Sequence, residues 1–154
     1  MSILVIIPTR RDLDAELAYR SFLAEDAMRA KCGHVDIVRV FDRVCGRGLV
    51  LEHLGDQHSH VMWIPDDVVV YDPLLPGLLV QKDPAASIAP QVKPQGVKGD
   101  SGAGLVEVNI MSACYIVPAD EYRIAECSQP KMYCDMSLTV WTHNSELVEK
   151  VAEK

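Results

Sequence analysis

Two adjacent acids, Asp66 and Asp67, stand in the segment "HVMWIPDDVVVYDP" directly after a run of apolar residues. The apolar run predicts a buried strand, and open α/β sheets gather their ligands at the carboxyl ends of such strands. Carboxylate oxygens at that place suit Mg²⁺ or Mn²⁺, which can bridge to the oxygens of a diphosphate. Aspartate is also common in turns, so a turn without any ligand is the alternative interpretation.

The sequence disfavours several other kinds of site, because their motifs are absent or their residues have the wrong spacing. The sequence lacks G-x-x-x-x-G-K-[ST], and the glycines of "GDSGAG" are in the wrong order for a dinucleotide fingerprint. "GDSG" is similar to the nucleophile segment of chymotrypsin-like serine proteases, but those enzymes are larger all-β proteins. No H-E-x-x-H motif or Cys/His zinc spacing includes any of the five histidines, which are His34, His53, His58, His60 and His143.

The first half of the chain predicts elements that alternate between strand and helix and would position the two acids. Apolar runs predict strands, while helical spacing of apolar residues, a possible cap at Asp12 and stops at Gly33 and Gly55 predict helices. The expected elements are a strand over 3–7 that Pro8 ends, a helix over 13–31, a strand over 35–41, a helix over 48–54 and a strand over 60–64. This alternation predicts a parallel sheet with helices on its faces.

The second half breaks the alternation, so the sheet is expected to be mixed. We expect a helical segment over 72–82, a short strand over 86–90, a loop over 91–104, one bent or two short strands over 106–117, a helix over 118–127 and a mainly helical tail from Asp135 onward. No repeat or linker divides the 154 residues, which indicates a single domain over 1–154.

Composition narrows the class of protein. The chain is 49% hydrophobic and 24% charged, as globular domains are, and its net charge of −7 disfavours nucleic acid as a partner. The five cysteines form no Cys-x-x-Cys pair and their number is odd, which favours reduced thiols and a cytoplasmic location. No apolar run approaches the roughly 20 residues that span a bilayer.

The order of several segments resembles a known family. "ILVIIPTRRD", "VDIVRVFDRV" and the stretch from "GRGLV" to "GLLV" follow one another as in the nucleotide-sugar half of family 2 glycosyltransferases with the GT-A fold. "NIMSACYIVPADEYR" and "KMYCDMSLTVW" are similar to the family's later strand and its acidic helix start. The resemblance covers nearly all of 3–141 and implies a single Rossmann-like α/β domain with a mixed, mainly parallel sheet flanked by helices.

The resemblance also implies roles for individual residues. Residues that would bind the nucleotide sugar are Pro8, Thr9 and Arg10 at the base and ribose, Asp42 at the base edge, and Arg47 and Asp66. Asp67 matches the second acid of the family's Asp-x-Asp motif and would bind Mn²⁺ or Mg²⁺ together with His143. Asp67 is therefore expected to face the same cleft as Pro8 and Arg10. The first acid of the motif is replaced here by Pro65.

Asp135 matches the acid that acts as general base in inverting members, although Cys134 replaces the usual preceding glutamate. As a general base it would take the proton from the acceptor hydroxyl. We expect Asp135 at the amino end of the last helix, where a helix cap without catalytic function is the alternative.

The implied activity is transfer of a sugar from a UDP- or GDP-sugar to an acceptor hydroxyl, with a divalent cation and inversion at the anomeric carbon. The acceptor is not specified by the sequence. Two other functions are open: a non-catalytic GT-A domain that binds a nucleotide or a protein partner, and a nucleotidyltransferase with a similar α/β arrangement.

Overall fold

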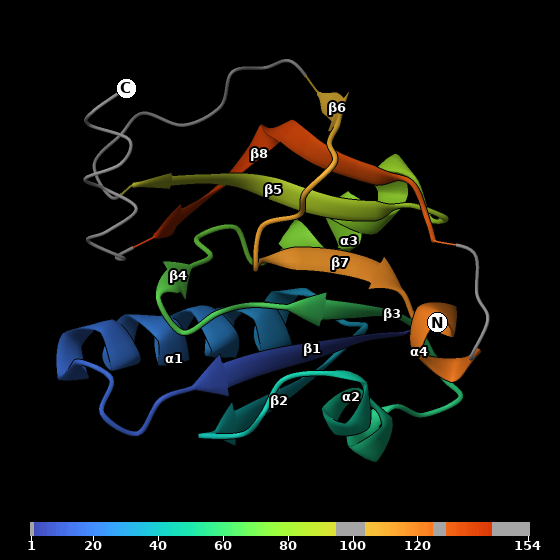
Figure 1. Cartoon of the computed structure of the whole chain (residues 1–154). Coiled ribbons are helices and arrows are strands. Elements are labelled where there is room, and N and C mark those ends of the chain that lie inside the picture. Colours follow the sequence, from blue (N-terminus) through green and yellow to red (C-terminus); the bar gives the residue numbers. More distant parts are fainter. Residues whose placement is uncertain (1, 95–103, 125–128, 143–154) are drawn as a thin grey trace.

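The computed structural model of the chain describes residues 2–94, 104–124 and 129–142 (Figure 1). The elements of the first half are β1 (Ser2–Thr9), α1 (Ala15–Lys31), β2 (Val35–Phe41), α2 (Arg47–His53), β3 (His58–Trp63), β4 (Val68–Val69) and α3 (Leu75–Lys82). Those of the second half are β5 (Ser87–Pro94), β6 (Leu105–Glu107), β7 (Tyr115–Pro118), α4 (Asp120–Arg123) and β8 (Met132–Thr142). No helix of these three ranges is long and apolar enough to cross a membrane.

All described strands belong to one mixed sheet with the order β2-β1-β3-β7-β5-β8-β4, and β6 pairs with β8 beside this path. The three longest ladders, β1 with β2, β1 with β3 and β5 with β8, are parallel. β7 runs antiparallel to both β3 and β5. The expected mixed, mainly parallel α/β sheet is therefore confirmed.

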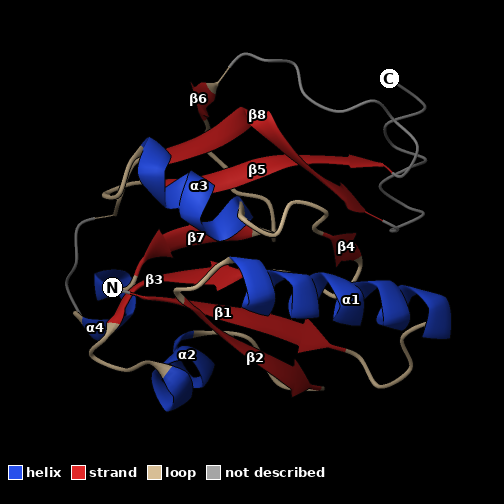
Figure 2. Ribbon diagram, turned by 180° about the vertical axis from the view of Figure 1, so that it is seen from behind, coloured by secondary structure: helices blue, strands red, loops and turns tan. Residues whose placement is uncertain are grey.

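The sheet has a hydrophobic core on each face. Alternate residues of β1 point to opposite sides, so Ile3, Val5 and Ile7 join a cluster that includes Leu79 of α3, whereas Ile6 joins a cluster with α2. Figure 2 shows α1 and α3 together on one side of the sheet. Because β1 is covered on both faces, its sequence is continuously apolar rather than alternating.

The early elements differ from expectation only at their ends. β1 continues through Pro8 to Thr9, beyond the last pairing of β1 with β3, so Pro8 lies where one neighbouring strand has ended and its missing N–H is tolerated. α1 is capped by Asp14 instead of Asp12, because the Asp14 carboxylate accepts hydrogen bonds from the backbone N–H groups of Glu16 and Leu17.

The helix expected from Asp135 onward is wrong over 135–142, because these residues belong to β8, and the rest of the expected helix lies outside the described residues. β8 has neighbouring strands on both of its edges. It pairs in parallel with β5, and it pairs antiparallel with β4 and β6. The residues 91–94, expected in a loop, extend β5 alongside the second half of β8. This long-range pairing overrides the local pattern that suggested a helix.

Candidate functional site

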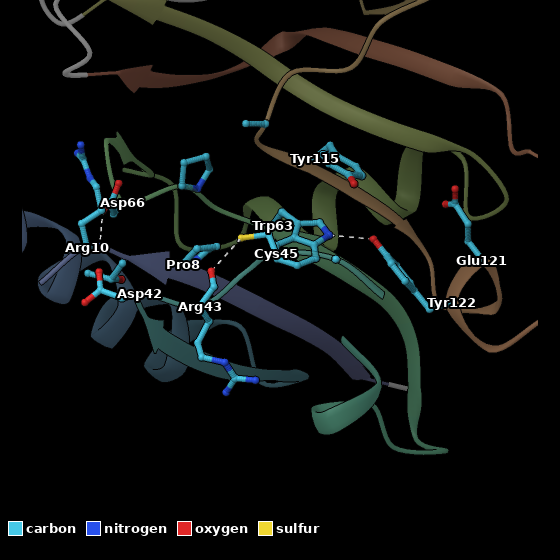
Figure 3. A pocket seen from close by; sticks show the side chains of 14 residues that line it. Pro8, Arg10, Asp42, Arg43, Cys45, Trp63, Asp66, Tyr115, Glu121 and Tyr122 are labelled. Atoms are coloured by element: carbon cyan, nitrogen blue, oxygen red, sulfur yellow. Dashed lines mark hydrogen bonds and ion pairs between the residues drawn. The ribbon is translucent and has the colours of Figure 1, made fainter. Parts of the chain in front are cut away.

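A cavity of about 680 Å³, called the main cavity below, lies where β1 and β2 end, and Figure 3 shows the side chains that line it. It lies on the face of the sheet against which Leu49 of α2 and Tyr122 of α4 pack. Its lining includes Pro8, Thr9 and Arg10 from the end of β1 and Asp42 from the loop after β2. The carboxyl ends of adjacent parallel strands form the crevice in which α/β sheets bind ligands. The structure therefore brings these four residues, predicted from the sequence, into one cavity.

Asp66 joins them and is tied to Arg10. Its carboxylate is almost fully buried, and the Oδ2 atom accepts hydrogen bonds from the backbone N–H of Arg10 at 2.8 Å and from its Nε at 3.2 Å. The hydrogen bond and the charge of Asp66 raise the pKa of the Arg10 guanidinium. The contact links the end of β1 to the turn after β3.

Asp42 adopts a left-handed backbone conformation with φ of 51° immediately after β2. Aspartate tolerates this conformation better than most residues, and such positions concentrate at functional sites. Its carboxylate accepts a hydrogen bond from the Arg11 backbone N–H at 3.3 Å and pairs with the Arg11 Nε at 3.0 Å. The loops after β1 and β2 are thus held together at the edge of the cavity.

A buried ion pair between Arg39 and Glu25 lies next to the same edge of the cavity. Arg39 of β2 donates to Glu25 of α1 at 3.1 Å, to Thr9 Oγ1 at 2.8 Å and to Ser21 Oγ at 2.9 Å. Both charged side chains are less than a tenth exposed. Since Thr9 lines the cavity, this network fixes the position of the end of β1 relative to α1 and β2.

Aromatic side chains line the inner part of the cavity. The Trp63 indole N–H donates to the Tyr122 hydroxyl at 2.8 Å, and Tyr115 lies beside them (Figure 3). Burial raises the pKa of Tyr122, so its hydroxyl is protonated at neutral pH. Burial likewise raises the pKa of Glu121, which lines the cavity next to this cluster. Flat aromatic walls of this kind can stack against a planar ring.

These aromatic residues were not among the site residues predicted from the sequence. Trp63 is the last residue of the strand that precedes the two acids, so its position in the sequence could have identified it as a site residue. Tyr115 and Tyr122 offered no such local signal, because their approach depends on the antiparallel pairing of β7 with β3, in which Tyr115 opposes Trp63.

Asp67 does not line the main cavity, contrary to expectation. It lines a neighbouring cavity of about 500 Å³ together with Ser112, Cys114 and Thr142, and the two cavities share Pro65 and Ala113. Burial, and secondarily the charge of Asp67, raises the pKa of the Cys114 thiol to about 12, so this cysteine is an inert packing residue. Asp67 still lies at the end of the sheet predicted for it.

The two adjacent acids therefore do not form a shared cation site. Asp66 is engaged by Arg10, while Asp67 faces the other cavity, and within 2–94, 104–124 and 129–142 no group of three His, Cys, Asp or Glu side chains is placed to hold a metal ion. His143, the other expected metal ligand, lies outside the described residues. Such ions are usually held by one or two carboxylates together with substrate phosphates, so binding of Mn²⁺ or Mg²⁺ by Asp67 stays a prediction from the sequence.

Asp135 lies away from the main cavity. Its fully buried side chain accepts hydrogen bonds from the backbone N–H and the hydroxyl of Ser137, at 3.0 and 2.6 Å, and its other oxygen is 3.9 Å from Lys82 Nζ on α3. The expected position at the start of a helix is wrong, because β8 replaces that helix. Arg47 contacts the cavity only indirectly, since its Nε donates to the backbone carbonyl of Tyr122 at 2.9 Å.

Solved glycosyltransferases share this fold. The structure of S. aureus TarS 1-349 superposes with a TM-score of 0.62 at 10% identity, over 98% of this chain and 63% of that one. The structure of TarS 1-349 in complex with UDP-GlcNAc superposes with a TM-score of 0.59 at 10% identity, over 92% of this chain and 58% of that one. A glycosyltransferase involved in glycosylation of the major capsid of PBCV-1 superposes with a TM-score of 0.51 at 10% identity, over 80% of this chain and 63% of that one.

The chain thus spans less than two thirds of the length of these structures, and at 10% identity the similarity concerns the fold. No protein-family profile matches the sequence, and no curated protein matches it.

Proposed function

We propose that this chain is a glycosyltransferase that binds a nucleotide-diphosphate sugar in the main cavity and transfers the sugar to an acceptor hydroxyl. The observation that carries the proposal is the cavity at the ends of β1 and β2, in a sheet whose arrangement is shared with solved glycosyltransferases. One of those structures is a complex with UDP-GlcNAc. The resemblance of the sequence to family 2 glycosyltransferases with the GT-A fold supports the same assignment.

The cavity suits a nucleotide in size and in chemistry. Its volume of about 680 Å³ lies within the usual range of roughly 300–1,000 Å³ for small-molecule sites. Trp63 and Tyr115 offer aromatic surface for the base, and Asp42 offers carboxylate oxygens for its polar edge. The sugar would then extend toward the neighbouring cavity that Asp67 lines, through the part of the wall that the two cavities share.

With donor and acceptor held side by side, the acceptor oxygen would bond to the anomeric carbon as the bond from that carbon to the nucleoside diphosphate breaks, which inverts the configuration. The nucleoside diphosphate would leave, and the hydroxyl proton would pass to a general base. Positioning the two reactants supplies much of the acceleration in such a reaction. The role of Asp135 as general base, the need for Mn²⁺ or Mg²⁺ and a cytoplasmic location stay predictions from the sequence.

Calorimetric titration with UDP, GDP and CMP, each with Mn²⁺ and with EDTA, tests donor binding. Asp42→Ala should weaken binding of the preferred nucleotide about tenfold, which corresponds to the roughly 1.4 kcal/mol of one good polar contact. Asp26→Ala, on the exposed side of α1, removes a carboxylate outside the cavity and should change nothing. Absence of nucleotide binding by the unaltered protein under both conditions would contradict the proposal.

Incubation with a panel of nucleotide sugars then tests transfer, by detecting which sugar is released or moved to an added acceptor. Pro65, which stands where the family's Asp-x-Asp motif has its first acid, favours one other function, a nucleotide-binding domain without catalysis. Tight nucleotide binding without sugar release from any donor would support that function instead. Release of diphosphate from a nucleoside triphosphate in the presence of a sugar phosphate would indicate a nucleotidyltransferase.

A further inference from the structure

A nucleotide-diphosphate sugar brings negative charge to the cavity, and among the described residues the cationic side chains that line it are Arg10 and Arg43. Arg43 lines the cavity but its Nη2 contacts both carboxylate oxygens of Glu52, at 2.7 and 2.9 Å. Arg11 pairs with Asp42, and Arg47 donates to a backbone carbonyl. Of the two arginines that line the cavity, Arg10 and Arg43, Arg10 is the one whose Nη atoms contact none of the described residues.

Asp66 holds Arg10 in a defined orientation. Its Oδ2 contacts Arg10 at two points, the backbone N–H and the side-chain Nε, so both the backbone and the guanidinium are held. The Arg10 side chain is 63% exposed while that of Asp66 is 10% exposed, so the guanidinium edge that carries the two Nη atoms is free to face a ligand. A planar guanidinium presented in this way matches two phosphate oxygens at once.

The same geometry disfavours Asp66 as a metal ligand. A divalent cation at Oδ2 would have to displace both hydrogen bonds from Arg10, and it would lie next to the positive charge of the guanidinium. The cation that pairs with Asp66 is therefore the guanidinium of Arg10.

We infer that Arg10, oriented by Asp66, binds the diphosphate of the donor, and that Asp66 is a positioning residue for this contact. The inference rests on the proposed function and makes it more specific. It reassigns Arg10 from the base and ribose to the phosphates. It also implies that part of the affinity for the diphosphate persists when divalent cations are removed.

The test compares ligands that differ only in phosphates. Calorimetry in EDTA would measure binding of UDP, UMP and uridine, or of the guanosine series if GDP binds more tightly, to the unaltered protein and to Arg10→Ala, Arg10→Lys and Arg20→Ala. We expect Arg10→Ala to weaken diphosphate binding at least tenfold and nucleoside binding less than twofold. The diphosphate affinity of Arg10→Lys should lie between those of the unaltered protein and Arg10→Ala, because an ammonium group keeps the charge but lacks the planar pair of donors.

Arg20→Ala is the matched control, since it removes an arginine that pairs with Glu16 on α1 at 2.7 Å and should leave all three affinities unchanged. The backbone N–H of Arg10 survives every substitution, so its contact with Asp66 is retained, and a thermal melt would confirm folding. Equal losses for the diphosphate and the nucleoside in Arg10→Ala would overturn the inference, as would complete loss of UDP and GDP binding in EDTA when Mn²⁺ restores it. Absence of binding in EDTA and in Mn²⁺ alike would overturn the proposed function itself.

Discussion

The ammonium group of Lys82 on α3 lies 3.9 Å from a carboxylate oxygen of Asp135, a completely buried residue of β8. That oxygen accepts no hydrogen bond within the described residues, whereas the other oxygen accepts two from Ser137. A buried carboxylate with one nearby cation and a local turn of hydrogen bonds fits a structural role, while the predicted catalytic role of Asp135 stays to be tested. It holds the irregular part of β8, where the pairing with β5 shifts register after Pro90.

Substitution of Asp135 separates this structural role from the catalytic role expected from the sequence. Asp135→Ala leaves the Ser137 N–H and hydroxyl without their acceptor and should lower the free energy of unfolding by about 1–3 kcal/mol in urea denaturation. Asp135→Asn keeps an oxygen for Ser137 and should lose less. Both variants should bind nucleotide as the unaltered protein does. If Asp135→Asn folds and binds normally but loses transfer, Asp135 is the general base after all.

The first half of the fold was predictable from the sequence because its signals are local. Continuous apolar runs at β1 and β3 indicated strands covered on both faces, and helical spacing indicated α1. β8 was missed because its partners, β4, β5 and β6, lie 26 or more residues earlier in the chain, from the pairing of Glu107 with Tyr133 upward, and no local pattern records that pairing. The misplacement of Asp135 follows directly from that error.

The candidate site was predictable in its location and less so in its details. Both acids after β3 were identified, yet which one faces the main cavity depends on a turn in which the Val68 N–H donates to the Pro65 carbonyl at 3.2 Å. Asp66 and Asp67 occupy the centre of this turn, so their side chains diverge into different cavities. A sequence pattern gives the spacing of two acids but not the direction in which a turn points them.

The hydrogen bond from Trp63 to Tyr122 provides a test of the aromatic part of the cavity. Tyr122→Phe leaves the buried indole N–H without its acceptor and should lower the free energy of unfolding by about 1 kcal/mol. Because the ring remains, nucleotide affinity should change less than twofold, whereas Tyr122→Ala should weaken it clearly. Tyr19→Phe removes a hydroxyl from an exposed site on α1 and is the control for urea denaturation. A Tyr122→Phe variant as stable as Tyr19→Phe would argue against the contact.

Breaking the buried pair of Glu25 and Arg39 should cost far more stability than breaking an exposed pair of α1. Glu25→Ala leaves the Arg39 guanidinium buried without its carboxylate and should cost about 3 kcal/mol, because an uncompensated buried charge is expensive. Glu16→Ala breaks an exposed pair with Arg20 and should cost about 0.5 kcal/mol or less. Chemical denaturation of both variants gives the comparison. Nearly equal losses would show that Arg39 is sufficiently held by Thr9 and Ser21.

Stability should fall below neutral pH in a manner that depends on His60. Its Nε2–H donates to the Pro84 carbonyl at 2.8 Å, its Nδ1 contacts the Ser59 hydroxyl at 2.8 Å, and burial lowers its pKa. Because the unfolded chain takes up a proton near pH 6.5 and the folded chain only at lower pH, the stability that neutral His60 confers is complete above about pH 6.5. It is lost progressively as the pH falls from there through the lowered pKa of the folded state.

Urea denaturation at pH 7.5 and pH 5.5 measures this dependence. The unaltered protein should lose more stability between the two values than His60→Asn does, because asparagine does not titrate. His34→Asn, at an exposed position, should behave like the unaltered protein and serves as the control. The comparison uses the difference between the two pH values, so any fixed cost of placing asparagine at the buried position cancels. An identical loss in His60→Asn and the unaltered protein would mean that His60 does not govern the acid side of the stability profile.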